Sequence, residues 1–217
     1  PFVSGKDSLN NEFRTREGGP RAIPGTLLIT ALGVVADVAK CRHTAFPRPG
    51  LPLWLAGGGE PLLGGSIYLR TLGRRGGGPD VPPIDLAASR ALFELVHQAL
   101  REELLEAVHD LSEGGLGAAL AESCFGEGIG ARVDLDRLPA ARAEHRWDQL
   151  LFAEGPGRFL LALRPGAEAR LRELAGPRAA PIGTTRAEPE LVVGRGGREL
   201  LREPLERLER SWREPLD

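Results

Sequence analysis

The sequence predicts an α+β fold, a sandwich in which helices pack against a mixed β-sheet. Two observations support this prediction. Strand-like apolar runs alternate along the chain with segments whose apolar residues recur at helical spacing. Near the end, two strand-like runs follow each other directly, at residues 181–185 and 190–193, and we expect them to pair as a hairpin. Such a β-β ending departs from the regular β-α alternation of a parallel sheet, so a mixed sheet is the better prediction.

The composition limits the classes of protein to consider. The chain has 217 residues, contains no methionine and begins with Pro1, so we expect a piece of a longer chain. A net charge of -2 gives no reason to expect nucleic acid or an anionic membrane as a partner. No apolar run approaches the roughly 20 residues that span a bilayer. Cys41 and Cys124 lack metal-binding spacing, and we expect free core thiols in a reducing compartment.

The N-terminal part is expected to be the end of an incomplete domain, residues 1–45. Residues 26–35 form an apolar run that predicts a strand buried on both faces, and one such strand cannot fold alone. The SGKDS turn at residues 4–8 has donors for a phosphate, although a surface turn is the simpler interpretation. Proline and glycine at residues 47–50 mark a boundary, and residues 46–217 are expected to form a complete domain.

Elements of the second domain follow from periodicity and capping. Asp85 is expected to cap a helix that extends to about Glu103, with its apolar face formed by Leu92, Leu95, Val96 and Ala99. The other expected elements are strands at 51–57, 106–108, 129–135 and 159–163, helices at 117–124, 168–174 and 204–212, and the two closing strands.

The most informative stretch is HDLSEGGL, residues 109–116, which we expect to form a turn between an inner strand and a helix N-terminus. Ser112 is expected to cap that helix, and Glu113 suits its positive end. His109 and Asp110 fall at the strand end, where α/β and α+β proteins commonly place chemistry. A capped helix with a hydrogen-bonded histidine is the simpler interpretation.

Three stretches together resemble one family: SGKDSLNNE at residues 4–12, HDLSEGGL at 109–116 and LFAEGPGRF at 151–159. In this order they are similar to the synthetase subunit of phosphoribosylformylglycinamidine synthase, in the aminoimidazole ribonucleotide synthetase-like superfamily. The resemblance covers essentially the whole chain and points to the second of two internal repeats. It implies that residues 1–45 end a barrel-forming N-terminal domain and that residues 46–217 resemble the C-terminal domain of aminoimidazole ribonucleotide synthetase.

The resemblance also implies an activity. The family is an ATP-dependent ligase of purine biosynthesis that converts formylglycinamide ribonucleotide and glutamine-derived ammonia to formylglycinamidine ribonucleotide, with ATP and Mg²⁺ as cofactors. The implied partners are the remainder of the synthetase chain, a glutaminase subunit and a small bridging subunit, in the cytoplasm. Most catalytic groups of the family lie in the first repeat, so we assign no catalytic residue here and expect the isolated chain to be inactive.

Site roles carry over residue by residue. Gly5 matches a glycine that contacts ATP, and Ser8 matches a substrate-binding serine. Lys6 stands where the family commonly has a metal-binding asparagine; an ammonium cannot bind Mg²⁺, so Lys6 is expected to meet a phosphate and Asp7 to offer a carboxylate to the metal. Asp110 is expected to lie near a nucleotide phosphate.

Two other interpretations stay open. The chain could belong to another ATP-using member of the superfamily, or it could be a non-catalytic structural or interaction module of the synthase complex. The sequence also leaves open whether the parent is the small multi-subunit or the large fused enzyme.

Overall fold

The computed structural model describes residues 5, 12–16, 18–23, 28–74, 81–139 and 141–214. The chain divides into two compact units, Pro1–Ala36 and Asp37–Asp217. In the first unit, β1 (Glu12–Arg14) and β2 (Pro20–Ala22) form an antiparallel hairpin with Glu12 opposite Ala22.

The predicted strand at residues 26–35 is wrong for its described part. Residues 28–35 form no strand, and their apolar side chains are exposed: Leu28 by 90%, Leu32 by 99% and Val34 by 98%. A strand is stabilised by neighbours that satisfy its backbone and cover its side chains, and no described residue pairs with this segment. The apolar segment is therefore left uncovered in the described part of the chain.

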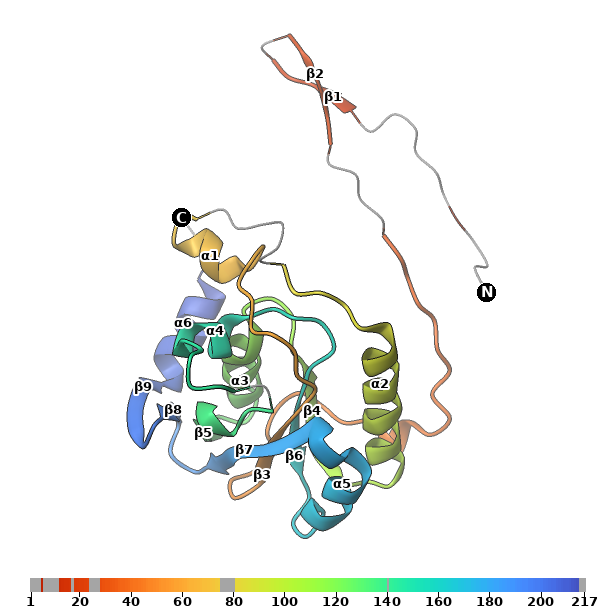
Figure 1. Cartoon of the computed structure of the whole chain (residues 1–217), viewed down its shortest axis with the longest axis vertical. Coiled ribbons are helices and arrows are strands. Elements are labelled where there is room, and N and C mark those ends of the chain that lie inside the picture. Colours follow the sequence, from red (N-terminus) through yellow and green to blue (C-terminus); the bar gives the residue numbers. More distant parts are fainter. Residues whose placement is uncertain are drawn as a thin grey trace. The chain divides into compact units, whose positions relative to one another are not determined.

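The second unit is built on a seven-stranded sheet of order β4-β6-β3-β7-β5-β8-β9 (Figure 1). Only the β5–β8 pair is parallel, which confirms the predicted mixed sheet. The strands are β3 (Pro52–Ala56), β4 (Leu105–Asp110), β5 (Gly130–Asp134), β6 (Phe159–Leu163), β7 (Ala179–Arg186), β8 (Glu190–Arg195) and β9 (Arg198–Pro204).

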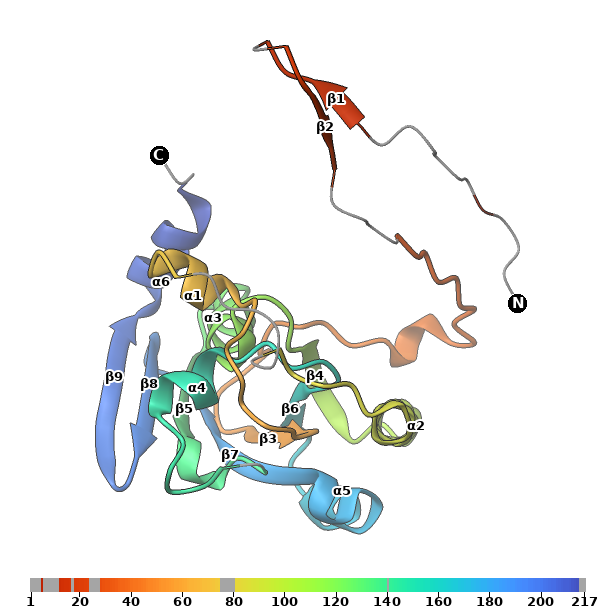
Figure 2. The same ribbon diagram turned by 45° about the horizontal axis from the view of Figure 1, so that its top comes forward.

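Helices cover both faces of this sheet and enclose two cores (Figure 2). The larger core lies under α3, α4 and α6, and the smaller core lies between the sheet and α2 and α5. The helices are α1 (Ile67–Thr71), α2 (Leu86–Arg101), α3 (Gly115–Phe125), α4 (Trp147–Phe152), α5 (Glu168–Ala175) and α6 (Leu205–Arg213), with short 3₁₀ turns at Val38–Lys40, Leu135–Arg137 and Gly176–Arg178.

Helix α2 confirms the expectation from periodicity and capping. The Asp85 carboxylate accepts a hydrogen bond from the Ala88 N–H at 2.9 Å, as an N-cap residue does. The buried residues of the helix are the four predicted ones, Leu92, Leu95, Val96 and Ala99. Because these signals are local, they predict the helix without knowledge of its tertiary contacts.

The predicted closing hairpin is wrong. Strand β5 lies between β7 and β8, antiparallel to the first and parallel to the second. Strand β8 forms its hairpin with β9 instead, through Gly196 and Gly197, which both have positive φ (58° and 71°). Two successive positive φ angles give a turn whose twist matches that of the flanking strands. This Gly-Gly pair is therefore typical of a two-residue hairpin turn, and it indicates the β8–β9 hairpin from the sequence alone.

The two cysteines differ in environment. Cys124 is a buried free thiol on α3, as expected. Cys41 is exposed, so its assignment to the core is wrong: it lies in an irregular segment outside both cores. In the part of the chain that the structure describes, no helix is long and apolar enough to cross a membrane.

Candidate functional site

The HDLSEGGL turn joins β4 to α3. His109 and Asp110 are the last two residues of β4, which is the edge strand rather than an inner strand of the sheet. The expected cap by Ser112 is wrong, because α3 begins one residue after Gly114, a left-handed residue with φ of 76° that has no side chain of its own to cap the helix. Ser112 instead donates its hydroxyl to Asp110 Oδ2 at 2.6 Å.

Asp110 is the predicted site residue that the structure describes best. Its side chain is 62% exposed, and the Ser112 hydrogen bond holds the pKa of the carboxyl below its usual value, with His109 acting in the same direction. The carboxylate is therefore ionised at neutral pH. A fixed and accessible carboxylate at a strand end suits contact with a cation or with ordered water.

His109 connects β4 to α3. Its Nε2 lies 2.8 Å from Glu122 Oε2 on α3, and its Nδ1 lies 3.4 Å from Asp110 Oδ1. The side chain is only 15% exposed. A ring held between two carboxylates in this way is suited to orienting the turn.

Glu154 brings two of the three motifs together, a role that the sequence did not reveal. Its Oε1 accepts hydrogen bonds from the backbone N–H of Gly114 at 2.8 Å and from that of Ile67 at 2.9 Å. One carboxylate oxygen therefore serves the N-terminal ends of both α3 and α1. The position expected for Glu113 at the positive end of α3 belongs to Glu154, because Glu113 is exposed.

Arg158 closes the loop that carries Glu154. The guanidinium is buried and donates hydrogen bonds to the carbonyl oxygens of Ala153 and Gly155. Burial lowers the pKa of Arg158 to about 10, and the charge of Glu154 opposes that shift. Its own carbonyl accepts a hydrogen bond from the Leu111 N–H at 2.9 Å, so the loop and the HDLSEGGL turn are joined a second time.

Close packing at α3 depends on small residues. A Cβ added to Gly115, whose φ is 59°, would overlap the Ala153 carbonyl oxygen, and one added to Gly117 would lie 2.7 Å from the Phe152 ring. These two glycines therefore let α3 contact the LFAEGPGRF segment directly.

A hollow of about 240 Å³ lies beside the same loop. It is lined by Gly58, Gly59, Glu60, Pro82, Pro83, Ile84, Asp85, Gly155, Pro156 and Arg158. Two carboxylates and one guanidinium line it, so its charge alone does not select an anion.

The other predicted site residues belong to the N-terminal unit. Gly5 is described and exposed. Lys6, Asp7 and Ser8 lie outside the described residues, so their phosphate, metal and substrate roles stay predictions. Within the described ranges, no group of three His, Cys, Asp or Glu side chains is placed to hold a metal ion.

The mixed sheet and the HDLSEGGL turn, with Gly114 and Gly115, lie within a domain of a known family. Residues 48–195 match the family model described as "AIR synthase related protein, C-terminal domain", and the chain belongs to this family. Its relatives include the phosphoribosylformylglycinamidine synthase subunits PurL of Moorella thermoacetica and Thermomicrobium roseum, each 38% identical, over 100% and 98% of this chain. The chain spans 28% and 27% of the length of these relatives.

Solved structures agree on the fold. Thermotoga maritima PurL complexed with ATP has a TM-score of 0.63 and 23% identity, covering 78% of this chain and 27% of that chain. The same protein complexed with FGAR has a TM-score of 0.61 and 22% identity, over 79% and 30% of the two chains. The hydrogenase maturation protein HypE in complex with ATP is less similar, with a TM-score of 0.52 and 20% identity, over 79% and 56%.

Proposed function

We propose that this chain is part of the synthetase subunit of phosphoribosylformylglycinamidine synthase, from its second repeat. The parent enzyme would convert formylglycinamide ribonucleotide, glutamine-derived ammonia and ATP to formylglycinamidine ribonucleotide, ADP and phosphate. The observation that carries this proposal is the 38% identity to the Moorella thermoacetica PurL subunit along the entire chain. The complexes of Thermotoga maritima PurL with ATP and with FGAR support the ligand classes.

The chemistry explains why a nucleotide is required. An amide oxygen is a poor leaving group, and ATP supplies the phosphoryl group that turns it into a good one. Asp110 is the described residue best suited to contact Mg²⁺, because one or two carboxylates together with phosphate oxygens are a common Mg²⁺ environment. Ser112 fixes that carboxylate, while Glu154 and Arg158 fix the turn that carries it.

Further roles are proposed for the N-terminal motif. Gly5 and Lys6 are proposed to contact the nucleotide, Asp7 the metal and Ser8 the substrate. The exposed apolar residues 28–35 are proposed to pack against the remainder of the synthetase chain. A glutaminase subunit and a small bridging subunit are the proposed partners, in the cytoplasm; the structure of PurLQS from Thermotoga maritima supports a multi-subunit assembly.

Two assays test this function. The chain alone is expected to catalyse no ATP hydrolysis dependent on formylglycinamide ribonucleotide, and turnover by it would contradict the partial-site interpretation. Replacing the matching segment of Moorella thermoacetica PurL with this chain should restore growth without purines to a strain that lacks the subunit. A folded chimaera that does not restore growth would contradict the proposal.

A non-catalytic module of the same complex is the second candidate. It is supported by the exposed apolar side chains of residues 28–35, which suit a contact with another protein surface. Calorimetric titration with ADP, with and without Mg²⁺, separates the nucleotide-binding part from the non-catalytic module. A purely structural domain should bind ADP in neither condition.

A further inference from the structure

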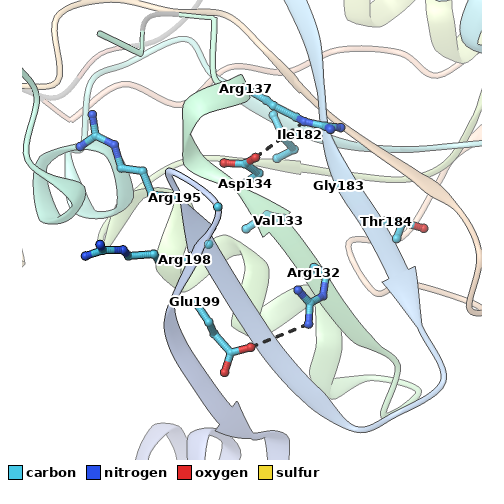
Figure 3. A pocket seen from close by; sticks show the side chains of 12 residues that line it. Arg132, Val133, Asp134, Arg137, Ile182, Gly183, Thr184, Arg195, Arg198 and Glu199 are labelled. Carbon is cyan, nitrogen blue, oxygen red and sulfur yellow. Dashed lines mark ion pairs between the residues drawn. The ribbon is translucent and has the colours of Figure 1, made fainter. Parts of the chain in front are cut away.

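A second hollow, of about 470 Å³, lies on the sheet beside β5, β7 and the β8–β9 hairpin (Figure 3). Its charged lining consists of Arg132, Arg137, Arg195, Arg198, Asp134 and Glu199, from β5, the turn after it and the β8–β9 hairpin. We call this the arginine groove.

The groove occupies a face of the sheet that the described helices leave open. Along β5, Ala131 and Val133 belong to the core under α3, so the alternating Arg132 and Asp134 point to the opposite face. On that opposite face, α2 and α5 pack in a core that draws its strand residues from β3, β4, β6 and β7. The part of the face over β5, β8 and β9 therefore presents charged side chains instead of a helix.

Four guanidinium groups line the groove with two carboxylates, and Asp136 beside the lining pairs with Arg195 at 3.1 Å, which leaves an excess of one positive charge. Glu199 is already held by Arg202 through hydrogen bonds of 2.9 and 2.7 Å, and lies 3.8 Å from Arg132. Arg198 forms no ion pair with any residue that the structure describes. The arginines are thus only partly neutralised by the chain itself.

The positions of the guanidinium groups indicate the shape of the missing counter-charge. Figure 3 shows Arg195 and Arg198 on one side of the groove, Arg132 beside Glu199, and Arg137 beside Asp134, so the groups surround the groove without converging on one point. Arg195 is anchored by Asp136 at 3.1 Å and by the carbonyl of Arg142 at 2.8 Å. A single phosphate favours converging donors, whereas spaced carboxylates along a polypeptide match spaced guanidinium groups.

We propose that the arginine groove docks an acidic segment of a separate polypeptide chain. The groove lies near the β9 edge of the sheet, whereas the chain enters this unit beside β4, the opposite edge, where the Val108 N–H donates to the His43 carbonyl. The segment that leads into this unit and the groove therefore lie at opposite edges of the sheet. This interaction is independent of the nucleotide site and goes beyond the proposed function.

The test measures binding of a fluorescein-labelled poly-glutamate peptide by fluorescence anisotropy at low salt. The double variant Arg132→Glu/Arg198→Glu should weaken the affinity about tenfold or more, because two exposed charge contacts become repulsive. The matched control is Arg90→Glu/Arg207→Glu, which makes the same change of charge at two exposed helix positions, each in one i,i+4 ion pair. It should stay within about twofold of the wild type.

Three outcomes would overturn the proposal. They are no binding of the peptide by the wild-type chain, equal weakening by the two double variants, and tighter binding of inorganic pyrophosphate than of the peptide at these arginines. The last result would identify a site for small anions instead of a protein contact. Circular dichroism verifies folding of each variant; if the double variant does not fold, Arg198→Gln alone should weaken the peptide about threefold, and an unchanged affinity would count against the groove.

Discussion

Replacement of Glu154 by alanine should destabilise the chain more than any other single change of an acidic residue in the candidate site. Oε1 accepts the N–H groups of Gly114 and Ile67, at 2.8 and 2.9 Å. Removing the carboxylate leaves both donors without their partner in a half-buried position, and it removes the negative charge that opposes the lowered pKa of the buried Arg158.

The magnitude follows from these contacts. Each lost hydrogen bond costs about 1 to 1.5 kcal/mol, so Glu154→Ala should lower the free energy of unfolding by about 2 to 3 kcal/mol. For a chain of this size that corresponds to a fall in Tm of about 5 to 10 °C. Glu154→Gln keeps an oxygen that can accept both N–H groups but loses the charge at two helix N-termini, which should cost only about 1 kcal/mol.

The assay is urea and thermal unfolding of the wild type, Glu154→Ala and Glu154→Gln, with Glu113→Ala as the matched control. Glu113 is an exposed carboxylate in the same turn, and its replacement should change the free energy of unfolding by less than about 0.5 kcal/mol. Equal stability of Glu154→Ala and Glu113→Ala would refute the reasoning. Equal damage by alanine and glutamine at position 154 would show that charge, and not the shared acceptor, holds the two helices.

Three further predictions concern packing, thiol labelling and pH. Gly115→Ala should lower stability by about 2 kcal/mol or more, whereas Gly128→Ala, with a similar φ of 65° but open space around it, should cost about 1 kcal/mol; equal losses in urea unfolding would contradict the close approach of α3 to Ala153. A thiol reagent should label Cys41 rapidly and Cys124 only after unfolding, because burial raises the pKa of Cys124 to about 12. The raised pKa of Cys124 also makes stability depend on pH. Its contribution to the stability of the folded state is fully present below pH 9.0, the ordinary pKa of the thiol, and is lost as the pH rises towards 12. The free energy of unfolding should therefore fall over that range in the wild type, and fall less in Cys124→Ala.

Local signals predicted much of the fold. The cap at Asp85 and the apolar spacing of α2 lie within one segment, and both were confirmed. The order of β7, β5 and β8 was not predictable in this way, because pairing between strands distant in sequence decides it. Strand β9 was missed even though Gly196 and Gly197 form a local turn signal.

In the candidate site, too, local sequence signals were predictable and contacts between residues distant in sequence were not. Asp110 was predicted as a site residue from its motif; the structure places it at an accessible strand end, and its role stays a prediction. The role of Glu154 was missed because its two hydrogen-bond donors lie 40 and 87 residues away in the sequence. Ser112 was assigned to the helix cap because its residue type fits, but the left-handed Gly114 moves the start of α3 beyond its reach.

The HDLSEGGL turn, fixed by Glu154 and Arg158, is proposed to present Asp110 to a magnesium-bound nucleotide. Isothermal titration calorimetry with ADP tests this claim most directly, comparing the wild type with Asp110→Asn in the presence and absence of Mg²⁺. We predict Mg²⁺-dependent binding by the wild type and an affinity at least about tenfold lower for Asp110→Asn, as expected when a charge-assisted contact is lost. Equal affinities of the two proteins, or no binding by the wild type, would contradict it.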